Sequence, residues 1–281
     1  MRFEKWQALG NDYLILEAQN LPWELNAKRV EWLCDPHFGI GSDGVLLLAR
    51  SEDPEFVAEL RIFNPDGSEA ELSGNGAREA ILYLRRHGWT DEDSFAIHTV
   101  AGPIRPTITG ELTCSVDMGH ASTASKDFPA GGEDGSGRLS AGGREWEFQH
   151  VSIGNPQCAI LVDPVELADL DLDLIGPEIE GSTLFPNRTN VSFLSVDDSH
   201  VRARIFERGV GETLSSGTGA SGAAITAFLN GAPSPITVEL DGGELTVAIS
   251  DDLAVRLDGW AEPVYAGEAS AELLAALAEQ D

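Results

Sequence analysis

The hydrophobic positions follow two different periods along the chain, which predicts a mixture of strands and helices. Residues 58–63 alternate polar and apolar, as a half-buried strand does, and the turn signal Asn64-Pro65-Asp66-Gly67 follows at once. The remaining predicted strands lie at 13–17, 45–48, two short stretches within 94–118, 156–162, 189–194, 201–206 and within 236–258. Helices are predicted at 22–35, around 80–84 with a stop at Gly88, at 164–180, from 217 to a stop at Gly231, and at 269–278.

The second half of the chain repeats the first. With residue 61 aligned to residue 204, ten of 28 ungapped positions are identical, including Arg61-Ile62-Phe63 with Arg204-Ile205-Phe206. One repeat of this length indicates a duplicated α/β (α+β) unit, because solenoid repeats are only 20 to 50 residues long. The sequence therefore predicts two similar lobes, with a ligand cleft between them. A composition change to Gly and Ser at 121–143 predicts a flexible excursion just past a boundary near Met118.

Charge narrows the range of partners. The 281 residues include 47 acidic and 18 basic side chains, for a net charge of −29. Such a surface repels nucleic acid and anionic membranes, so neither is expected as a partner. The acids are spread along the chain, which favours a surface adapted to high salt over an acidic partner-binding face. Three widely spaced cysteines and the lack of an export segment or long apolar run predict a cytoplasmic protein without disulfides or a metal site.

Two glycine-rich turns carry the candidate chemistry: residues 73–78, SGNGAR, and residues 216–221, SGTGAS. A small residue and two glycines at a helix start leave backbone N–H groups pointing outward, which makes a site for carboxylate or phosphate. The alternative is plain capping by Ser73 and Ser216. Gly217, Gly219 and Gly222 also fit a dinucleotide fingerprint, but weakly, because the preceding strand ends well upstream and the first copy has Glu79 at the third glycine.

These turns belong to a larger set of motifs that resembles the diaminopimelate epimerase family over nearly the whole chain, in order and spacing. The motifs are GND at 10–12, NPDGSEA at 64–70, SGNGAR at 73–78, GNP at 154–156, TNV at 189–191 and ERGVGET at 207–213 running into SGTG at 216–219. The resemblance implies two pseudo-symmetric lobes, each a mixed or antiparallel sheet wrapped around a central helix. Their expected extents are 1–117 plus 265–281, and 118–264.

The activity that the resemblance implies is the conversion of LL- to meso-diaminopimelate in lysine biosynthesis. It proceeds without a cofactor, through two bases that remove and return the α-hydrogen. The expected partner is a small amino acid with carboxylates. A homodimer is a possible assembly. The implied catalytic residues are Ser73, Ser216 and Glu207. The implied substrate contacts are Asn11, Asn64, Gly74, Asn75, Asn155, Asn190, Glu207, Arg208, Gly217 and Thr218. Amides and N–H groups suit the carboxylates and amine, while Glu207 and Arg208 form a charge pair beside the reacting centre.

The chain departs from the family at both base positions. Family members have cysteine there, whereas this chain has Ser73 and Ser216, and Gln157 replaces the family's histidine. A hydroxyl is a much weaker acid than a thiol and needs a neighbouring base to become reactive. Cys158 does not compensate, because it is expected to face the opposite side of its strand, in the core.

Three explanations follow from these departures. The chain is an epimerase with serine at both positions, a catalytically impaired relative that binds the ligand without turnover, or an epimerase silenced by design. A further alternative on the same architecture is a carboxylate-based isomerase, as in the phenazine-biosynthesis relatives. Its candidate acids are Asp66, Glu69, Glu207 and Glu212. Glu69 and Glu212 have a simpler reading as charges that complement the helix dipoles.

Overall fold

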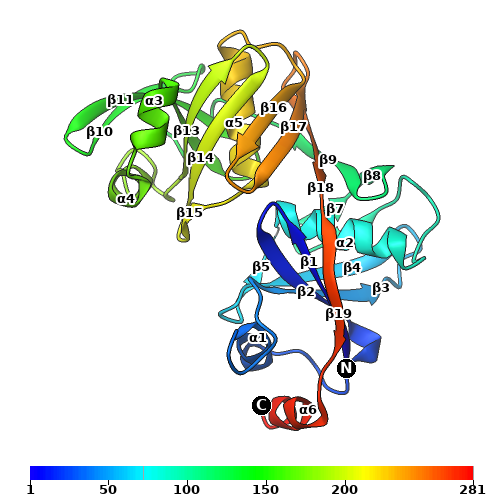
Figure 1. The fold of residues 1–281 in the computed structure, drawn as a ribbon. Coiled ribbons are helices and arrows are strands. Elements are labelled where there is room, and N and C mark those ends of the chain that lie inside the picture. The colour runs from blue at the N-terminus through cyan, green and yellow to red at the C-terminus, as the bar shows by residue number, and fades with distance from the viewer. Residues whose placement is uncertain (72, 281) are drawn as a thin grey trace. The chain divides into compact units, whose positions relative to one another are not determined.

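The protein is described here by a computed structural model covering residues 1–71 and 73–280 (Figure 1). The chain divides into two compact units. The first consists of Met1–Val116 and Trp260–Asp281, and the second of Asp117–Gly259. Each unit contains a sheet and one long helix that packs against several of its strands, which confirms the predicted α+β fold with two sheets.

The first unit is built around helix α2 (Gly74–Arg86). Its sheet has the order β19-β1-β2-β3-β4-β6-β7, with β5 paired to β4. The strands are β1 (Arg2–Ala8), β2 (Asn11–Glu17), β3 (Val45–Arg50), β4 (Ala58–Phe63), β5 (Glu69–Ala70), β6 (Ile97–Thr99), β7 (Gly102–Ile104) and β19 (Glu262–Glu268). The outlying helices are η1 (Ala18–Asn20), α1 (Ala27–Cys34) and α6 (Ala271–Ala278). Helix α2 packs on β1, β2 and β3 and is buried from Asn75 to Leu84.

The second unit is built around helix α5 (Gly217–Leu229), which is buried on nearly all sides. Such a helix must be apolar or small all round, and its sequence GTGASGAAITAFL meets that need. The second sheet has the order β10-β11-β12-β13-β14-β16-β17-β18-β9-β8, with β15 paired to β14. Its strand β8, the start of β9 and Trp260 belong to the residues of the first unit, and the rest of this sheet belongs to the second unit. The strands are β8 (Pro106–Gly110), β9 (Thr113–His120), β10 (Ser136–Ala141), β11 (Arg144–Ser152), β12 (Pro156–Leu161), β13 (Asn190–Asp197), β14 (His200–Glu207), β15 (Gly211–Thr213), β16 (Ile236–Leu240), β17 (Gly243–Ile249) and β18 (Ala254–Trp260), and the helices are α3 (Pro164–Asp169) and α4 (Leu172–Glu180).

The two units repeat one topology. The run β1-β2-β3-β4-β6-β7 has the same order as β11-β12-β13-β14-β16-β17. The parallel pairs correspond as well, β2 with β3 and β4 with β6 in the first unit, and β12 with β13 and β14 with β16 in the second. Helices α2 and α5 begin and end at residues that match in the sequence repeat. The duplication predicted from sequence is therefore a duplication of structure.

Several element predictions needed correction. The helix predicted at 22–35 begins only at Ala27, because Asn26 caps it by accepting a hydrogen bond from the Arg29 N–H. The predicted excursion at 121–143 contains β10, which pairs with β11 through six residues. Residues 94–118 hold four strands or parts of strands instead of two. Strands β1 and β19 were not predicted, since their pairing partners lie at opposite ends of the chain.

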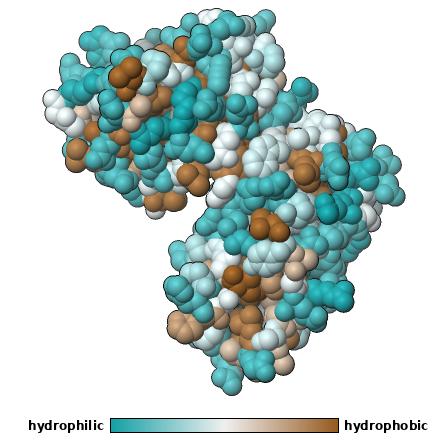
Figure 2. Space-filling model, in the orientation of Figure 1, coloured by the Kyte–Doolittle hydropathy of each residue, from teal (hydrophilic) through white to brown (hydrophobic). Residues whose placement is uncertain are grey.

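The surface and the core follow the composition. Figure 2 shows hydrophilic residues over much of the visible surface, with the hydrophobic residues in small separate groups. Cys158 is fully buried within the apolar cluster of the second unit, which confirms its predicted core position, and its burial raises the pKa of the thiol. Among the described residues, no helix has both the length and the apolar character needed to cross a membrane.

Candidate active site

The two base-position serines begin the two central helices. Ser73 and Ser216 both have extended backbone and stand at the N-caps of α2 and α5. Ser73 Oγ accepts a hydrogen bond from the Gly76 N–H at 3.1 Å, and Ser216 Oγ accepts one from the Gly219 N–H at 3.2 Å. Both serines therefore cap their helices. Each serine also has a second side-chain contact, and these second contacts differ between the units.

The fourth residue of each turn, Gly76 or Gly219, lies close to a side chain of a neighbouring strand. A Cβ on Gly219 would come within 2.6 Å of Ile205 Cδ1 in β14, and one on Gly76 within 2.9 Å of Leu46 Cδ2 in β3. Real Cβ atoms essentially never approach this closely, so a larger residue would force the end of the Leu46 or Ile205 side chain to move. The glycines thus allow each helix start to pack closely on its neighbouring strand.

In the second unit the serine is bonded to a carboxylate. Ser216 Oγ donates a hydrogen bond to Glu207 Oε2 at 2.9 Å, and Thr213 Oγ1 donates to Glu207 Oε1 at 2.9 Å. Burial raises the pKa of Glu207, and these two hydrogen bonds oppose the rise by stabilising the charged form. Ser216 itself is only 4% exposed. A hydroxyl whose proton already points at a buried carboxylate can pass that proton on as its oxygen takes up another.

In the first unit the serine is bonded to a phenol. The Tyr13 hydroxyl donates to Ser73 Oγ at 3.2 Å. Ser73 Oγ therefore accepts two hydrogen bonds, from Tyr13 and from the Gly76 N–H. The position that corresponds to Tyr13 in the second unit, one residue after the Asn-Pro pair, is Gln157, so the two units differ at this strand position.

Amide side chains join each helix start to the strand beside it. In the first unit, Asn75 Nδ2 donates to Asn11 Oδ1 at 3.3 Å, and Asn11 Nδ2 donates to Asp43 Oδ2 at 3.0 Å. In the second unit, Asn155 Nδ2 donates to Thr218 Oγ1 at 3.1 Å. These two pairs occupy matching positions of the repeat, and all four residues were predicted substrate contacts. Gly74 and Gly217, also predicted, are the first helical residues beside them.

Three other predicted contacts lie at strand ends: Asn190 begins β13, and Arg208 and Asn64 follow β14 and β4. Asn190 Oδ1 accepts from the Arg208 N–H at 2.8 Å, which ties the β13 start to the end of β14. The Arg208 guanidinium donates to the Asn187 carbonyl at 3.0 Å. Glu207 and Arg208, predicted as a charge pair beside the reacting centre, each contact other residues in the described structure. Asn64 is held within its own turn by a hydrogen bond to Ser68 Oγ at 2.9 Å.

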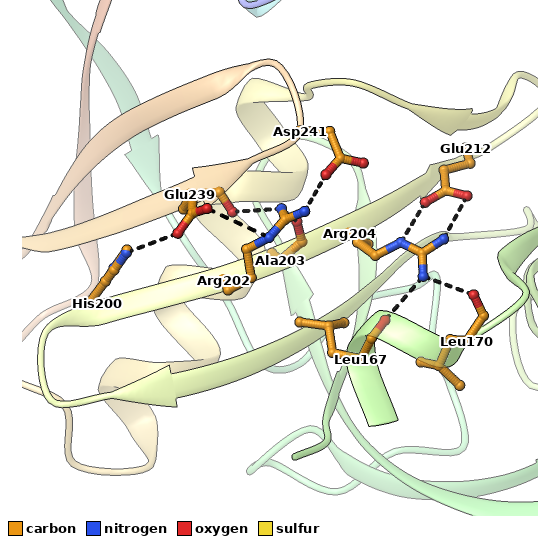
Figure 3. Close-up of polar contacts among 9 residues, drawn as sticks. All are labelled: Leu167, Leu170, His200, Arg202, Ala203, Arg204, Glu212, Glu239 and Asp241. Atoms are coloured by element: carbon orange, nitrogen blue, oxygen red, sulfur yellow. Dashed lines mark hydrogen bonds and ion pairs between the residues drawn. The ribbon is translucent and has the colours of Figure 1, made fainter. Parts of the chain in front are cut away.

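The alternative carboxylate bases have structural partners. Arg61 binds both oxygens of Glu69, and Arg204 binds both oxygens of Glu212, at distances of 2.8 to 3.0 Å. Figure 3 shows that Arg204 also reaches the carbonyls of Leu167 and Leu170, at 3.0 and 2.8 Å. The ion pair lowers the pKa of Glu69.

Asp66 also has local partners: it accepts hydrogen bonds from Ser68, and these lower its pKa. Among the four candidate acids, Glu207 is the one that contacts a base-position serine.

Sequence reasoning missed two residues of the first unit. Tyr13 stands three positions after the Gly10 turn, and only its position in the repeat, opposite Gln157, marks it out. Arg78 is fully buried in α2, and burial lowers its pKa to about 10. Its guanidinium donates to Asn75 Oδ1 at 2.6 Å and to the Gly74 carbonyl at 3.1 Å, so it orients the first helical turn.

Comparisons with known proteins identify the family of the chain. The family model for diaminopimelate epimerase matches residues 3–124 and 149–264. "Diaminopimelate epimerase 2" of Nostoc sp. is 40% identical over 284 residues, which cover 98% of each chain. "Diaminopimelate epimerase" of Synechococcus sp. (strain JA-3-3Ab) is 39% identical over 279 residues, covering 95% of this chain and 97% of the relative.

Solved structures share the fold at low sequence identity. A phenazine biosynthesis protein of the PhzF family from Bacillus anthracis has a TM-score of 0.69 at 19% identity and covers 96% of this chain and 99% of its own. A predicted epimerase from Pseudomonas aeruginosa has a TM-score of 0.64 at 17% identity, covering 95% and 98%. On the family model and the relatives of about 40% identity, the chain belongs to the diaminopimelate epimerase family.

Proposed function

We propose that this protein is a diaminopimelate epimerase that interconverts the LL and meso isomers by proton transfer at the α-carbon, with Ser73 and Ser216 at the two base positions. The observation that carries the proposal is the hydrogen bond from Ser216 Oγ to Glu207 Oε2 at 2.9 Å. It supplies what a serine at a base position lacks, a neighbouring proton acceptor. Membership of the family and the matched polar pairs at both helix starts support the same assignment.

The proton removal is balanced within the second unit. The α-carbon–hydrogen bond breaks and its proton goes to Ser216 Oγ, while the hydroxyl proton of Ser216 moves to Glu207 Oε2. The substrate becomes a carbanion stabilised by its carboxylate, and Glu207 becomes a neutral acid. Because burial raises the pKa of Glu207, the carboxylate is a stronger base than an exposed glutamate would be.

The substrate carboxylates fit the helix starts. The N-terminal ends of α2 and α5 supply N–H groups and positive dipole potential, and Asn11, Asn75, Asn155 and Thr218 add donors and acceptors around them. A dicarboxylic amino acid of this kind places the chain in lysine biosynthesis, as its relatives' names imply.

The test is exchange of the α-hydrogen in deuterium oxide, followed by proton NMR with LL- and meso-diaminopimelate in turn. We expect substrate-dependent exchange with inversion in the natural protein. The double variant Ser73→Cys, Ser216→Cys should exchange faster by at least about tenfold, because a thiol ionises far more readily than a hydroxyl. Ser221→Cys is the matched control, since Ser221 is fully buried in α5 and should give no increase. Absence of exchange in both the natural protein and the double variant would contradict the proposal.

A further inference from the structure

The two base-position hydroxyls have opposite hydrogen-bond roles. Ser216 Oγ donates to a carboxylate, Glu207. Ser73 Oγ instead accepts from a phenol, Tyr13, and also from the Gly76 N–H. An oxygen that accepts two hydrogen bonds has its own proton pointing away from both donors. Ser216 is thus set to take up a proton, and Ser73 is set to give one.

We propose that Tyr13 is the positioning residue of the first unit, supplying a proton through Ser73 to the carbanion that Ser216 and Glu207 create. This inference rests on the proposed epimerase function and adds to it the missing acid. A serine at this position cannot act as a thiol does, because its hydroxyl gives up a proton only if another group replaces it in the same step. Tyr13 is the group whose hydroxyl touches Ser73 Oγ.

Packing holds the phenol in place. Tyr13 lies in β2, opposite Trp6 of β1, and is 6% exposed. A Cβ on Gly44 would come within 2.6 Å of Tyr13 Cε1, so the ring lies directly on the backbone at Gly44. The phenol therefore has little rotational freedom, and its hydroxyl keeps its direction toward the helix start.

The second unit lacks this device. At the corresponding position Gln157 donates from Nε2 to Asn155 Oδ1 at 2.6 Å and has no hydroxyl to offer. The first unit, in turn, has Asn64 at the position that matches Glu207 in the repeat. The first unit thus has a phenol, Tyr13, beside its serine, and the second unit has a carboxylate, Glu207, beside its serine. The two groups stand at different positions of the repeat. This complementarity is what a reaction with one acceptor and one donor needs.

The second half of the reaction is balanced as follows. The proton of Ser73 Oγ moves to the carbanion and forms the new carbon–hydrogen bond, while the phenolic proton of Tyr13 moves to Ser73 Oγ. Together with the first half, one proton has left Tyr13 and one has reached Glu207. The substrate keeps its composition and no oxidant or reductant takes part. Reaction in the opposite direction, or exchange with solvent, restores the starting protonation.

The experiment is a double-mutant cycle on inversion rate, measured by circular dichroism with Tyr13→Phe and Ser73→Cys. With Ser73 present, Tyr13→Phe should lower kcat by at least about 10²-fold at unchanged KM, the usual contribution of a positioned acid. In the Ser73→Cys background, the same change should lower kcat by less than about threefold, because a thiol of pKa about 8.5 supplies its own proton. Tyr83→Phe, which removes a phenol bonded to Glu17 in the same unit, should leave kcat unchanged.

Two results would overturn the inference: natural kcat in Tyr13→Phe, or a loss of the same factor with serine and with cysteine at position 73, which indicates a purely structural role. Failure of the proposed function is distinguishable from either. In that case the double variant Ser73→Cys, Ser216→Cys, with Tyr13 intact, would not invert the substrate at all.

Discussion

At the scale of single residues, the two serines predicted at the base positions have matching places at the starts of α2 and α5. Both serines cap their helices, and a glycine three residues later packs closely on a neighbouring strand in each unit. What differs is the second contact, a carboxylate for Ser216 and a phenol for Ser73. In the proposed mechanism, each of these neighbours supplies the proton transfer that a serine alone lacks, and the neighbour is different in each unit.

Thr213 tunes the proposed base. Its hydroxyl donates to Glu207 Oε1, and this stabilises the carboxylate and opposes the rise in pKa caused by burial. Thr213→Val keeps the shape and removes the donor, so the pKa of Glu207 should rise further. Because the carboxylate is the active form, activity falls as the pH drops through this pKa, and the acid limb of the kcat/KM profile should move to higher pH. Thr237→Val in β16 is the control, and an unmoved limb in Thr213→Val would exclude Glu207 as the group that titrates.

Glu79 presents a different case, a buried acid with no role in the proposed reaction. It is fully buried in α2, and burial raises its pKa well above the usual range, while Arg78 acts in the opposite direction. Neither carboxyl oxygen has a hydrogen bond of normal geometry among the described residues, and the nearby Tyr13 backbone N–H lowers the pKa of Glu79 only slightly against the effect of burial. Ionisation of such a buried group destabilises the folded state.

We expect Glu79→Met to stabilise the protein, since methionine has a similar volume and no polar atoms. A raised folded-state pKa means that Glu79 weakens the fold as the pH rises from the unfolded pKa toward the folded one. The gain in free energy of unfolding should therefore be small near pH 4 and reach about 1–3 kcal/mol at pH 8. Urea denaturation at both values measures it, with the exposed Glu92→Met as control. A gain that is the same at both pH values would contradict a buried, protonated Glu79.

At the scale of elements, the sequence predicted what depends on local pattern. The strand at 58–63 and the two helix starts agree with β4, α2 and α5, because alternation, turn signals and capping serines are encoded within a few residues. The pairing of β1 with β19 joins opposite ends of the chain, so no local pattern announces it. Strand β10 was not predicted, because its Gly and Ser residues do not favour a strand. It forms by pairing with β11.

The candidate site divides in the same way. Residues inside the glycine-rich turns and their flanking amides could be predicted, because they stand in compact motifs. Tyr13 and Arg78 could not, because the contact of Tyr13 with Ser73 joins residues 60 positions apart and the role of Arg78 depends on its burial. The ion pairs of Glu69 and Glu212 were missed although both partners of each pair are close in sequence. Arg61 and Arg204 are visible in the repeat, but only the pairing of β4 with β5 and of β14 with β15 brings the charges together.

These two ion pairs allow the effect of burial on the strength of an ion pair to be compared at matching positions. The side chains of Arg61 and Glu69 are 49% and 32% exposed, whereas those of Arg204 and Glu212 are 17% and 26% exposed. Glu69→Gln should cost less than about 1 kcal/mol of unfolding free energy, as exposed pairs do. Glu212→Gln should cost about 1–3 kcal/mol, because it leaves a largely buried guanidinium with only carbonyl partners. Urea denaturation of the two variants decides this, and equal costs would show that burial does not set the strength of the pair.

At the scale of the whole molecule, duplication and charge act on different properties. The repeated topology gives two equivalent frames, and substitutions such as Gln157 for Tyr13 and Glu207 for Asn64 have made them chemically unequal. The charge has no such pattern, because the 47 acidic residues are spread along the chain. Its effect is therefore expected on the stability of the whole fold and not on one site.

A net charge of −29 should make the fold depend on salt. Repulsion between exposed carboxylates is screened over about 10 Å at 0.1 M salt and about 3 Å at 1 M, so the compact state gains more from salt than the expanded one. We expect the Tm to rise by at least about 2–4 °C between 0.05 M and 1 M KCl, followed by circular dichroism. The control is a variant in which five exposed glutamates become lysine, at Glu52, Glu92, Glu111, Glu133 and Glu279. Its smaller net charge should flatten the dependence of Tm on salt, and an equal slope in both proteins would attribute the salt effect to something other than carboxylate repulsion.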